Sequence, residues 1–191
     1  MVSVNEMVSL HKYFFWCDRM RVLFQESLRD YGNNPIIEYF FKNEEYIKIQ
    51  HLWATDVGLY MSYWYSGLYV VIEGWQELNL HDENIDLLLE SPYVELLKRY
   101  RNGAFHYQNN DYDKRFSNFI DIGADTSDWI LKLNNEFSRY FLDYFKRFMK
   151  ENNILDLDSA IESVKIKIKQ KEDSKTISAF IDMLMANKKL D

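Results

Sequence analysis

The feature that most constrains this chain is a stretch without any charge, residues 57–72, bounded by Asp56 and Glu73. Apolar and aromatic side chains recur there and on both sides of it at about 3.6 residues, so we predict one long helix over residues 46–79. Its main stripe consists of Trp53, Val57, Tyr60, Met61, Trp64, Leu68, Val71, Ile72, Trp75 and Leu78. We expect this helix to form the spine of the fold.

The same stretch is too short and too polar to cross a membrane. A spanning helix needs about 20 apolar residues, whereas this stretch includes several Tyr and two Ser. The N-terminus carries Glu6 where a secretory signal needs a basic start and an apolar run, and Cys17 is the single cysteine. We therefore expect a cytoplasmic protein with no membrane partner.

The opposite side of the predicted helix is also far from polar. This second face consists of Leu59, Ser62, Ser66, Tyr69, Val70 and Glu73. A helix that is apolar or aromatic nearly all round lies either at the centre of a bundle or at an interface with a second subunit. The second alternative predicts a homodimer, and the sequence leaves both open.

Composition extends the helical prediction to the whole chain. The 191 residues hold only six Gly and two Pro, which leaves little material for tight turns. We predict an all-α, up-down bundle of four to five helices over residues 1–153. The tail at 154–191 is predicted to form a short helical appendage, although the alternation of apolar residues with Lys at 164–169 would also fit a strand. The further helices of the bundle are expected at residues 5–30, 36–41, 92–107 and 125–149.

Two of these helices have stripes that predict their buried sides. The stripe of the first helix consists of Leu10, Phe14, Cys17, Phe24 and Leu28. The stripe of the last consists of Trp129, Leu133, Phe137, Tyr140, Phe141, Tyr144, Phe145 and Phe148. The first stripe repeats at steps of three, four or seven residues, and the second also falls on one side of a helix, as expected for helices packed on one side.

Charge and motifs exclude several classes of function. With 23 Lys plus Arg against 30 Asp plus Glu, the net charge of −7 gives nucleic acid no broad basic surface, so DNA is not an expected partner, although a small local basic site fits this balance. The chain has no Gly-rich phosphate loop, serine elbow, Cys pair or His-Glu-x-x-His. His11, His51 and His81 stand alone. We expect neither a cofactor nor a metal.

The segment at residues 98–108, Lys-Arg-Tyr-Arg-Asn-Gly-Ala-Phe-His-Tyr-Gln, stands out. On a helix Arg101 falls within the apolar arc, where an unpartnered guanidinium is very costly, and Glu73 is the most economical partner for it. Asn102 and His106 are four residues apart and would share a face, which Lys98 extends backward.

Two interpretations of this segment compete. In the structural one, Arg101 forms a core ion pair, Asn102 begins to unwind the helix and His106 caps its end. In the functional one, the three side chains meet a phosphate. A His can move protons to or from a ribose 2′-OH and a leaving oxygen, and an Arg can stabilise the charge that develops on the phosphate during RNA cleavage.

The pattern Arg101-Asn102-x-x-x-His106, on a helix that follows a long aromatic-rich helix, resembles the signature of HEPN domains, named for higher eukaryotes and prokaryotes nucleotide-binding. The resemblance covers about residues 5–150. It implies a four- to five-helix bundle, commonly a homodimer, in which two motifs face each other across a shared cleft. Many members are metal-independent endoribonucleases of toxin–antitoxin, phage-defence or RNA-processing systems. Others are inactive binding or dimerisation modules, frequently beside a nucleotidyltransferase.

The resemblance assigns roles to the motif residues. Arg101 would bind the scissile phosphate, Asn102 would position it or hold His106, and His106 would be the acid or base. Lys98 and Tyr107 flank the motif and are supporting candidates, as is Glu73 on the separate ground of its pairing with Arg101. Gly103 lowers the stability of the helix within the motif, because Gly inside a helix costs about 1 kcal/mol relative to Ala.

The leading hypothesis is therefore a metal-independent endoribonuclease, a toxin or phage-defence component, that leaves a 2′,3′-cyclic phosphate and a 5′-OH end. The implied partners are an RNA substrate, a second copy of the chain, and an antitoxin or nucleotidyltransferase. Two alternatives stay open. One is a non-catalytic nucleotide- or protein-binding or dimerisation module, and the other is a helical bundle that binds a small molecule in a pocket lined by Tyr and Trp.

Overall fold

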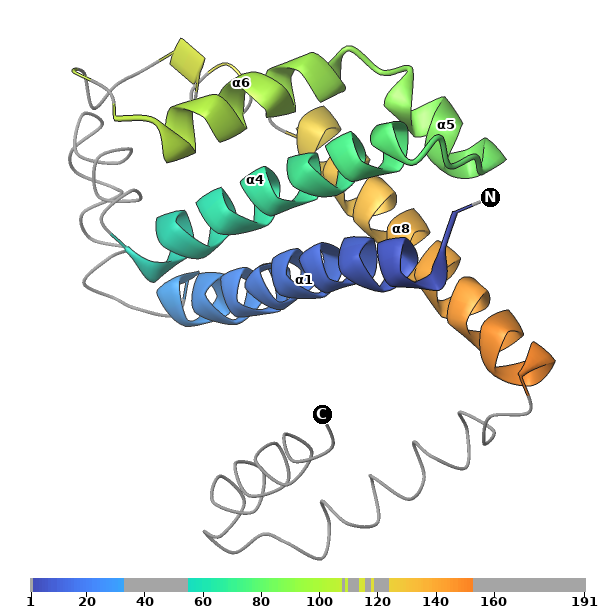
Figure 1. Ribbon diagram of the computed structural model, residues 1–191. Helices are drawn as coiled ribbons and strands as arrows, with labels where there is room; N and C mark the ends of the chain where they lie inside the picture. The colour runs from blue at the N-terminus through green and yellow to red at the C-terminus, as the bar shows by residue number, and fades with distance from the viewer. Residues whose placement is uncertain are drawn as a thin grey trace, which may run out of the picture. The chain divides into compact units, whose positions relative to one another are not determined.

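The structure, a computed structural model, describes residues 2–32, 55–107, 109, 114, 115, 118 and 124–152 (Figure 1). These residues form helices and no strand, which confirms the all-α prediction for this part of the chain. The helices are α1 (Val4–Gly32), α4 (Asp56–Glu77), α5 (Glu83–Leu89), α6 (Tyr93–Phe105) and α8 (Ala124–Glu151). The predictions for residues 36–41 and 154–191 lie outside the described residues.

The chain divides into two compact units, Met1–Phe141 and Leu142–Asp191. The first unit contains α1, α4, α5, α6 and the larger part of α8. In the second, the described residues are 142–152, where the rings of Tyr144 and Phe145 meet edge to face with centroids 5.2 Å apart. No helix within the described ranges is long and apolar enough to span a membrane.

Helix α1 follows its prediction closely, with one correction. Leu10, Phe14 and Cys17 are buried, and Phe24 packs against Trp64 with ring centroids 5.6 Å apart. Leu28 was expected in the same stripe, but its side chain is 47% exposed. The reason is geometric, because positions that repeat at three and four residues drift about 20° per heptad around a straight helix.

Two glycines of α4 allow α1 to pack closely against it. A Cβ atom at Gly67 would lie 2.7 Å from the Cβ of Cys17, and one at Gly74 would lie 2.5 Å from Cδ1 of Leu10. Real Cβ atoms essentially never approach that closely, so the contact at Gly67 requires a residue without a side chain, whereas at Gly74 the end of the flexible Leu10 side chain could move aside. These contacts pair the later residues of α4 with the earlier residues of α1, so the two helices run antiparallel.

Helix α4 lies at the centre of the first unit, between α1 and α6 (Figure 1). The middle of its second face is covered by α6 of the same chain, since the hydroxyls of Ser62 and Tyr100 are 3.1 Å apart and Tyr69 lies under Arg101. Ser66 is fully buried, whereas Leu59 at the start of this face is 47% exposed. The central position of α4 accounts for most of a helix that is apolar nearly all round.

The start of α4 corrects the prediction of a continuous helix from residue 46. Thr55 is extended and its side chain accepts a hydrogen bond from the backbone N–H of Gly58 at 3.4 Å, so α4 begins at Asp56. The predicted residues 46–54 lie outside the described residues, and the apolar period that runs through Trp53 hides this helix start. Thr followed by an acidic residue is an N-terminal signal that the period alone does not reveal.

Helix α8 buries the predicted Trp129, Leu133, Phe137 and Phe141. It also buries Asn134, which the stripe does not predict. The Asn134 amide accepts a hydrogen bond from Nε1 of Trp64 at 3.0 Å and donates one to Asp18 at 2.8 Å. Because a buried amide is costly unless its hydrogen bonds are made, this residue fixes the register of α8 against α1 and α4.

Helix α5 is a short element that the sequence indicates only as an apolar patch. Asp82 caps it by accepting hydrogen bonds from the backbone N–H groups of Asn84 and Ile85 at 3.2 and 3.3 Å. Arg139 of α8 donates to the same carboxylate at 2.6 Å. Burial alone would raise the pKa of Asp82, but these hydrogen bonds hold it below its ordinary value. The cap therefore ties α5 to α8.

Candidate functional site

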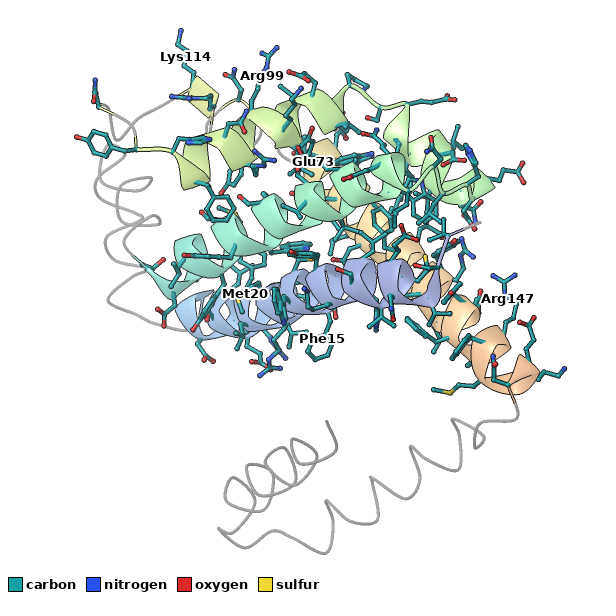
Figure 2. All side chains as sticks on the ribbon, viewed as in Figure 1. Phe15, Met20, Glu73, Arg99, Lys114 and Arg147 are labelled. Atoms are coloured by element: carbon teal, nitrogen blue, oxygen red, sulfur yellow. The ribbon has the colours of Figure 1, made fainter. Side chains whose placement is uncertain are left out.

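Helix α6 carries the Arg-Asn-x-x-x-His segment and begins at Tyr93, whose backbone N–H donates to the Ser91 hydroxyl at 3.3 Å. Glu95 in its first turn pairs with Lys98 and Arg99, at 3.7 and 3.4 Å. Figure 2 shows Arg99 on the side of α6 that faces away from α4. Lys98, a supporting candidate, is thus an exposed side chain with a carboxylate partner on its own helix.

The helix ends at Phe105, earlier than predicted, and this changes the position of His106. His106 is exposed and extended, with φ −119° and ψ 131°, and its backbone N–H donates to the carbonyl of Asn102 at 3.2 Å. His106 therefore lies one turn beyond Asn102, at the end of the helix and not inside it. Gly103 in the last turn weakens the helix there. The predicted capping position of His106 is confirmed.

Arg101 has the partner that the sequence predicts. Its Nη2 lies 2.5 Å from Oε2 of Glu73, and its Nη1 donates to Oδ1 of Asn102 at 3.0 Å (Figure 2 labels Glu73 between α4 and α6). Its Cζ lies 5.4 Å from the ring centre of Tyr69. Burial and the Glu73 carboxylate raise the pKa of Tyr69. Three neighbours thus hold one guanidinium in place.

The Arg101–Glu73 pair is only partly buried. The side chains are 26% and 41% exposed, so solvent and small ions reach both charged groups. Within the guanidinium, Nε is buried and has no hydrogen-bond partner among the described residues, so the accessible N–H groups are those on Nη1 and Nη2. The structure therefore does not seal Arg101 in the core.

Contacts between α4 and α6 show in which direction Arg101 reaches. Tyr63 contacts Phe105, with ring centroids 5.8 Å apart, whereas Arg101 reaches Glu73. Tyr63 and Glu73 are about 15 Å apart along α4, but Arg101 and Phe105 are only about 6 Å apart along α6. The side chains of Arg101, Glu73, Tyr63 and Phe105 together span this difference, so the guanidinium leans toward the start of α6. This direction is away from the helix end that precedes His106.

An exposed apolar surface borders the end of α6. We call it the motif-end patch, and it consists of Leu59, Tyr63, Phe105 and Tyr107. The first three are about half exposed, and Tyr107 is 92% exposed. The sequence places Tyr107 beside the motif but gives no sign of the patch, because Tyr63 and Phe105 come together only when α4 and α6 pack. Exposed apolar clusters of this kind mark interaction surfaces.

A cavity of about 400 Å³ lies between α1 and α4. Its polar lining includes the carboxylates of Glu6, Glu73 and Glu77 and the ring of Tyr13. No Trp lines it, since Trp64, Trp75 and Trp129 are buried in the core. The cavity thus differs from the Tyr- and Trp-lined pocket that the small-molecule alternative predicts. Its three carboxylates disfavour the binding of anions.

The remaining titratable groups form no metal site in the part of the chain that the structure describes, where no group of three or more His, Cys, Asp or Glu is placed to hold an ion. His81 lies 3.4 Å from Asp86 and is exposed. Burial raises the pKa of the Cys17 thiol, so this group stays a neutral core side chain.

Comparison with known proteins identifies no relative. No family model matches the chain, and neither a curated protein nor a solved structure does. Any function is therefore inferred from the residues of the chain and their geometry.

Proposed function

We propose that this chain is a HEPN-type, metal-independent endoribonuclease that acts as a homodimer, with Arg101 and His106 of each site supplied by different copies. The observation that carries this proposal is the position of the motif. Arg101 is partly exposed, His106 is exposed, and Phe105 and Tyr107 of the motif-end patch flank His106 in the chain. A polar motif bordered by exposed aromatic side chains suits a site that is completed by a second molecule.

The direction of Arg101 supports a composite site. Its guanidinium extends back along α6, whereas His106 lies beyond the opposite end of the same helix. A two-fold axis beside Asn102 would run the two copies of α6 antiparallel. The guanidinium of one copy would then point toward His106 of the partner subunit. The motif-end patch, which includes Leu59 from the second face of α4, would provide apolar surface for this contact.

The chemistry follows from these groups. Neutral His106 accepts the proton of the ribose 2′-OH, and the 2′-oxygen attacks phosphorus to form the 2′,3′-cyclic phosphate. The bond from phosphorus to the 5′-oxygen breaks, and that oxygen takes a proton from His106 or from water. Arg101 stabilises the charge that develops on the phosphate oxygens, and the Asn102 amide holds the phosphate in position.

The biological setting in this proposal comes from the HEPN resemblance. It is a cytoplasmic toxin or phage-defence component, with an antitoxin or a nucleotidyltransferase as its protein partner. The net charge of −7 means that RNA is held at one small site and not along a basic surface. Arg99 and Lys98 lie close to the motif, but Glu95 balances part of their charge.

RNA cleavage in EDTA by the wild type and by His106→Ala tests this function. We expect the wild type to cleave single-stranded RNA and the variant to lose about 10²- to 10⁴-fold in rate, the usual contribution of a general acid or base. His81→Ala is the matched control, since it removes another exposed histidine. Undiminished cleavage by His106→Ala would remove the assigned acid or base.

One observation favours a second candidate, the non-catalytic binding module. Glu73 already balances the charge of Arg101, as it would if the motif only joined α6 to α4. This candidate predicts that RNA is not cleaved by the wild type under any metal condition. It also predicts that Arg101→Ala lowers the free energy of unfolding, and that this variant, like the wild type, does not cleave RNA.

A further inference from the structure

We infer that Glu73 is autoinhibitory. Its carboxylate binds the Arg101 guanidinium of the same chain, competes with RNA phosphate for it, and so keeps the affinity of Arg101 for the phosphate low. This inference rests on the proposed function in one respect, the identity of the anion as an RNA phosphate. It concerns Glu73, which is outside the Arg-polar-x-x-x-His motif. Binding of the phosphate then requires that the contact between Glu73 and Arg101 opens.

The first ground is that both anions need the same N–H groups. Nη2 of Arg101 is 2.5 Å from Glu73, Nη1 donates to Asn102, and Nε is buried. Carboxylate and phosphate bind a guanidinium in the same planar, two-pronged geometry. Glu73 and Asn102 already take one N–H on each outer nitrogen, so a phosphate bound across both nitrogens would lie directly against the Glu73 carboxylate and compete with it.

The second ground is charge. In the absence of Glu73, Arg101 would present a full positive charge at a site that is 26% exposed. The adjacent carboxylate offsets this attraction and repels an incoming phosphate, because two like charges a few ångströms apart still repel each other at the effective dielectric near a protein surface. The lining of the neighbouring cavity by Glu6 and Glu77 adds to this negative field.

The third ground is that the contact can open without unfolding the helix pair. Glu73 is 41% exposed, and α6 is also held to α4 by the hydroxyl contact between Ser62 and Tyr100 and by the ring contact between Tyr65 and Tyr100. A partly exposed ion pair contributes little to stability. Arg101 also keeps its contact with the Tyr69 ring. The pair is thus better suited to a displaceable contact than to a structural bond.

The test is the affinity for anions of the full-length Glu73→Gln variant, measured by calorimetry with inorganic phosphate and with a short single-stranded RNA that carries 2′-O-methyl groups and cannot be cleaved. The Gln amide oxygen still accepts a hydrogen bond from Arg101, so the direction of the guanidinium is kept while the charge is removed. We expect about tenfold tighter binding of both probes, the change that corresponds to loss of one charged hydrogen bond.

Three controls make the result specific. Glu77→Gln removes the same charge one turn further along α4, where no ion pair is formed within the described residues, and we expect a clearly smaller gain. In an Arg101→Ala background, Glu73→Gln should have no effect. Glu73→Ser, with thermal unfolding measured for every variant, provides a second charge-removing substitution if the Gln variant folds poorly.

Unchanged or weaker binding of phosphate by the folded Glu73 variants would overturn the inference, and so would a gain that persists without Arg101. These outcomes are separate from failure of the proposed function. If no variant cleaves RNA but Glu73→Gln tightens phosphate binding through Arg101, the ribonuclease proposal fails and the competition stands. If the wild type cleaves RNA and Glu73→Gln binds no tighter, the competition fails alone.

Discussion

Arg101 shows how one residue can serve the fold and the site together. The three groups around its guanidinium, from Glu73, Asn102 and Tyr69, set both its direction and its charge balance. The sequence predicts the ion pair, because a guanidinium in an apolar arc needs a carboxylate and Glu73 is the charge nearest to that arc. It does not predict the direction, which depends on the register of α6 along α4.

His11 gives a prediction at the same scale. Its ring packs beside those of Phe14 and Phe141, with centroids 6.4 and 5.0 Å away, and burial lowers its pKa below the ordinary 6.5. The unfolded chain therefore binds a proton more readily than the folded one, so the free energy of unfolding should fall as the pH drops below about 6.5 toward the lower folded pKa.

Denaturant unfolding measured from about pH 5 to about pH 7.5 tests this effect, because the range spans the pKa of about 6.5 of an unfolded histidine. His11→Gln should flatten the fall in stability over this window, whereas His81→Gln, at an exposed position, should leave it in place. Equal pH dependence in the wild type and in His11→Gln would contradict the assignment.

At the scale of elements, packing of α1 against α4 gives the first unit its central contact. The period of each helix predicts which residues are buried, but the separation of the helices depends on Gly67 and Gly74. A pattern of apolar residues does not show that close packing of two helices requires a glycine at the point of contact. The same limit applies to Asn134, a polar residue whose burial makes sense only beside Trp64 and Asp18.

The two glycines predict different responses to alanine. At Gly67 the new Cβ would meet the Cβ of Cys17 at 2.7 Å, and the Cα lies behind it at 3.5 Å, so the helices must separate. Overpacking of this kind costs about 1–3 kcal/mol. At Gly74 the obstacle is the end of the flexible Leu10 side chain, which can rotate, and Ala gains about 1 kcal/mol in helix propensity.

Urea unfolding of both variants checks this prediction. Since Ala gains about 1 kcal/mol in helix propensity at both positions, we expect Gly67→Ala to lower the free energy of unfolding by up to about 2 kcal/mol net, and Gly74→Ala to leave it unchanged or raise it by up to about 1 kcal/mol. Gly74→Ala thus serves as the matched control for Gly67→Ala. Equal effects at the two positions would show that the close approach at Gly67 does not limit the packing.

At the scale of the molecule, local signals predict the elements better than they predict their assembly. The strong periods of α4 and α8 indicate both helices, and the all-α class follows from them. The helix ends at Thr55 and Phe105 were missed, because a cap or a Gly can stop a helix inside an apolar pattern. The motif-end patch was missed because it forms only when α4 and α6 meet.

The composite site is the central claim at this scale, and complementation between two inactive variants tests it most directly. Arg101→Ala and His106→Ala are each expected to abolish cleavage, and both should remain dimeric by sedimentation. When the two variants are co-expressed or co-refolded, half of the dimers are mixed, and each mixed dimer has one site with an intact Arg101 and an intact His106 from different copies.

Cleavage of single-stranded RNA in EDTA by this mixture is the deciding measurement. If Arg101 of one copy works with His106 of the partner subunit, the mixture should recover about a quarter of the wild-type rate, because half of the dimers each carry one of two sites. A mixture as inactive as either variant alone, with mixed dimers verified to be present, would contradict the composite site.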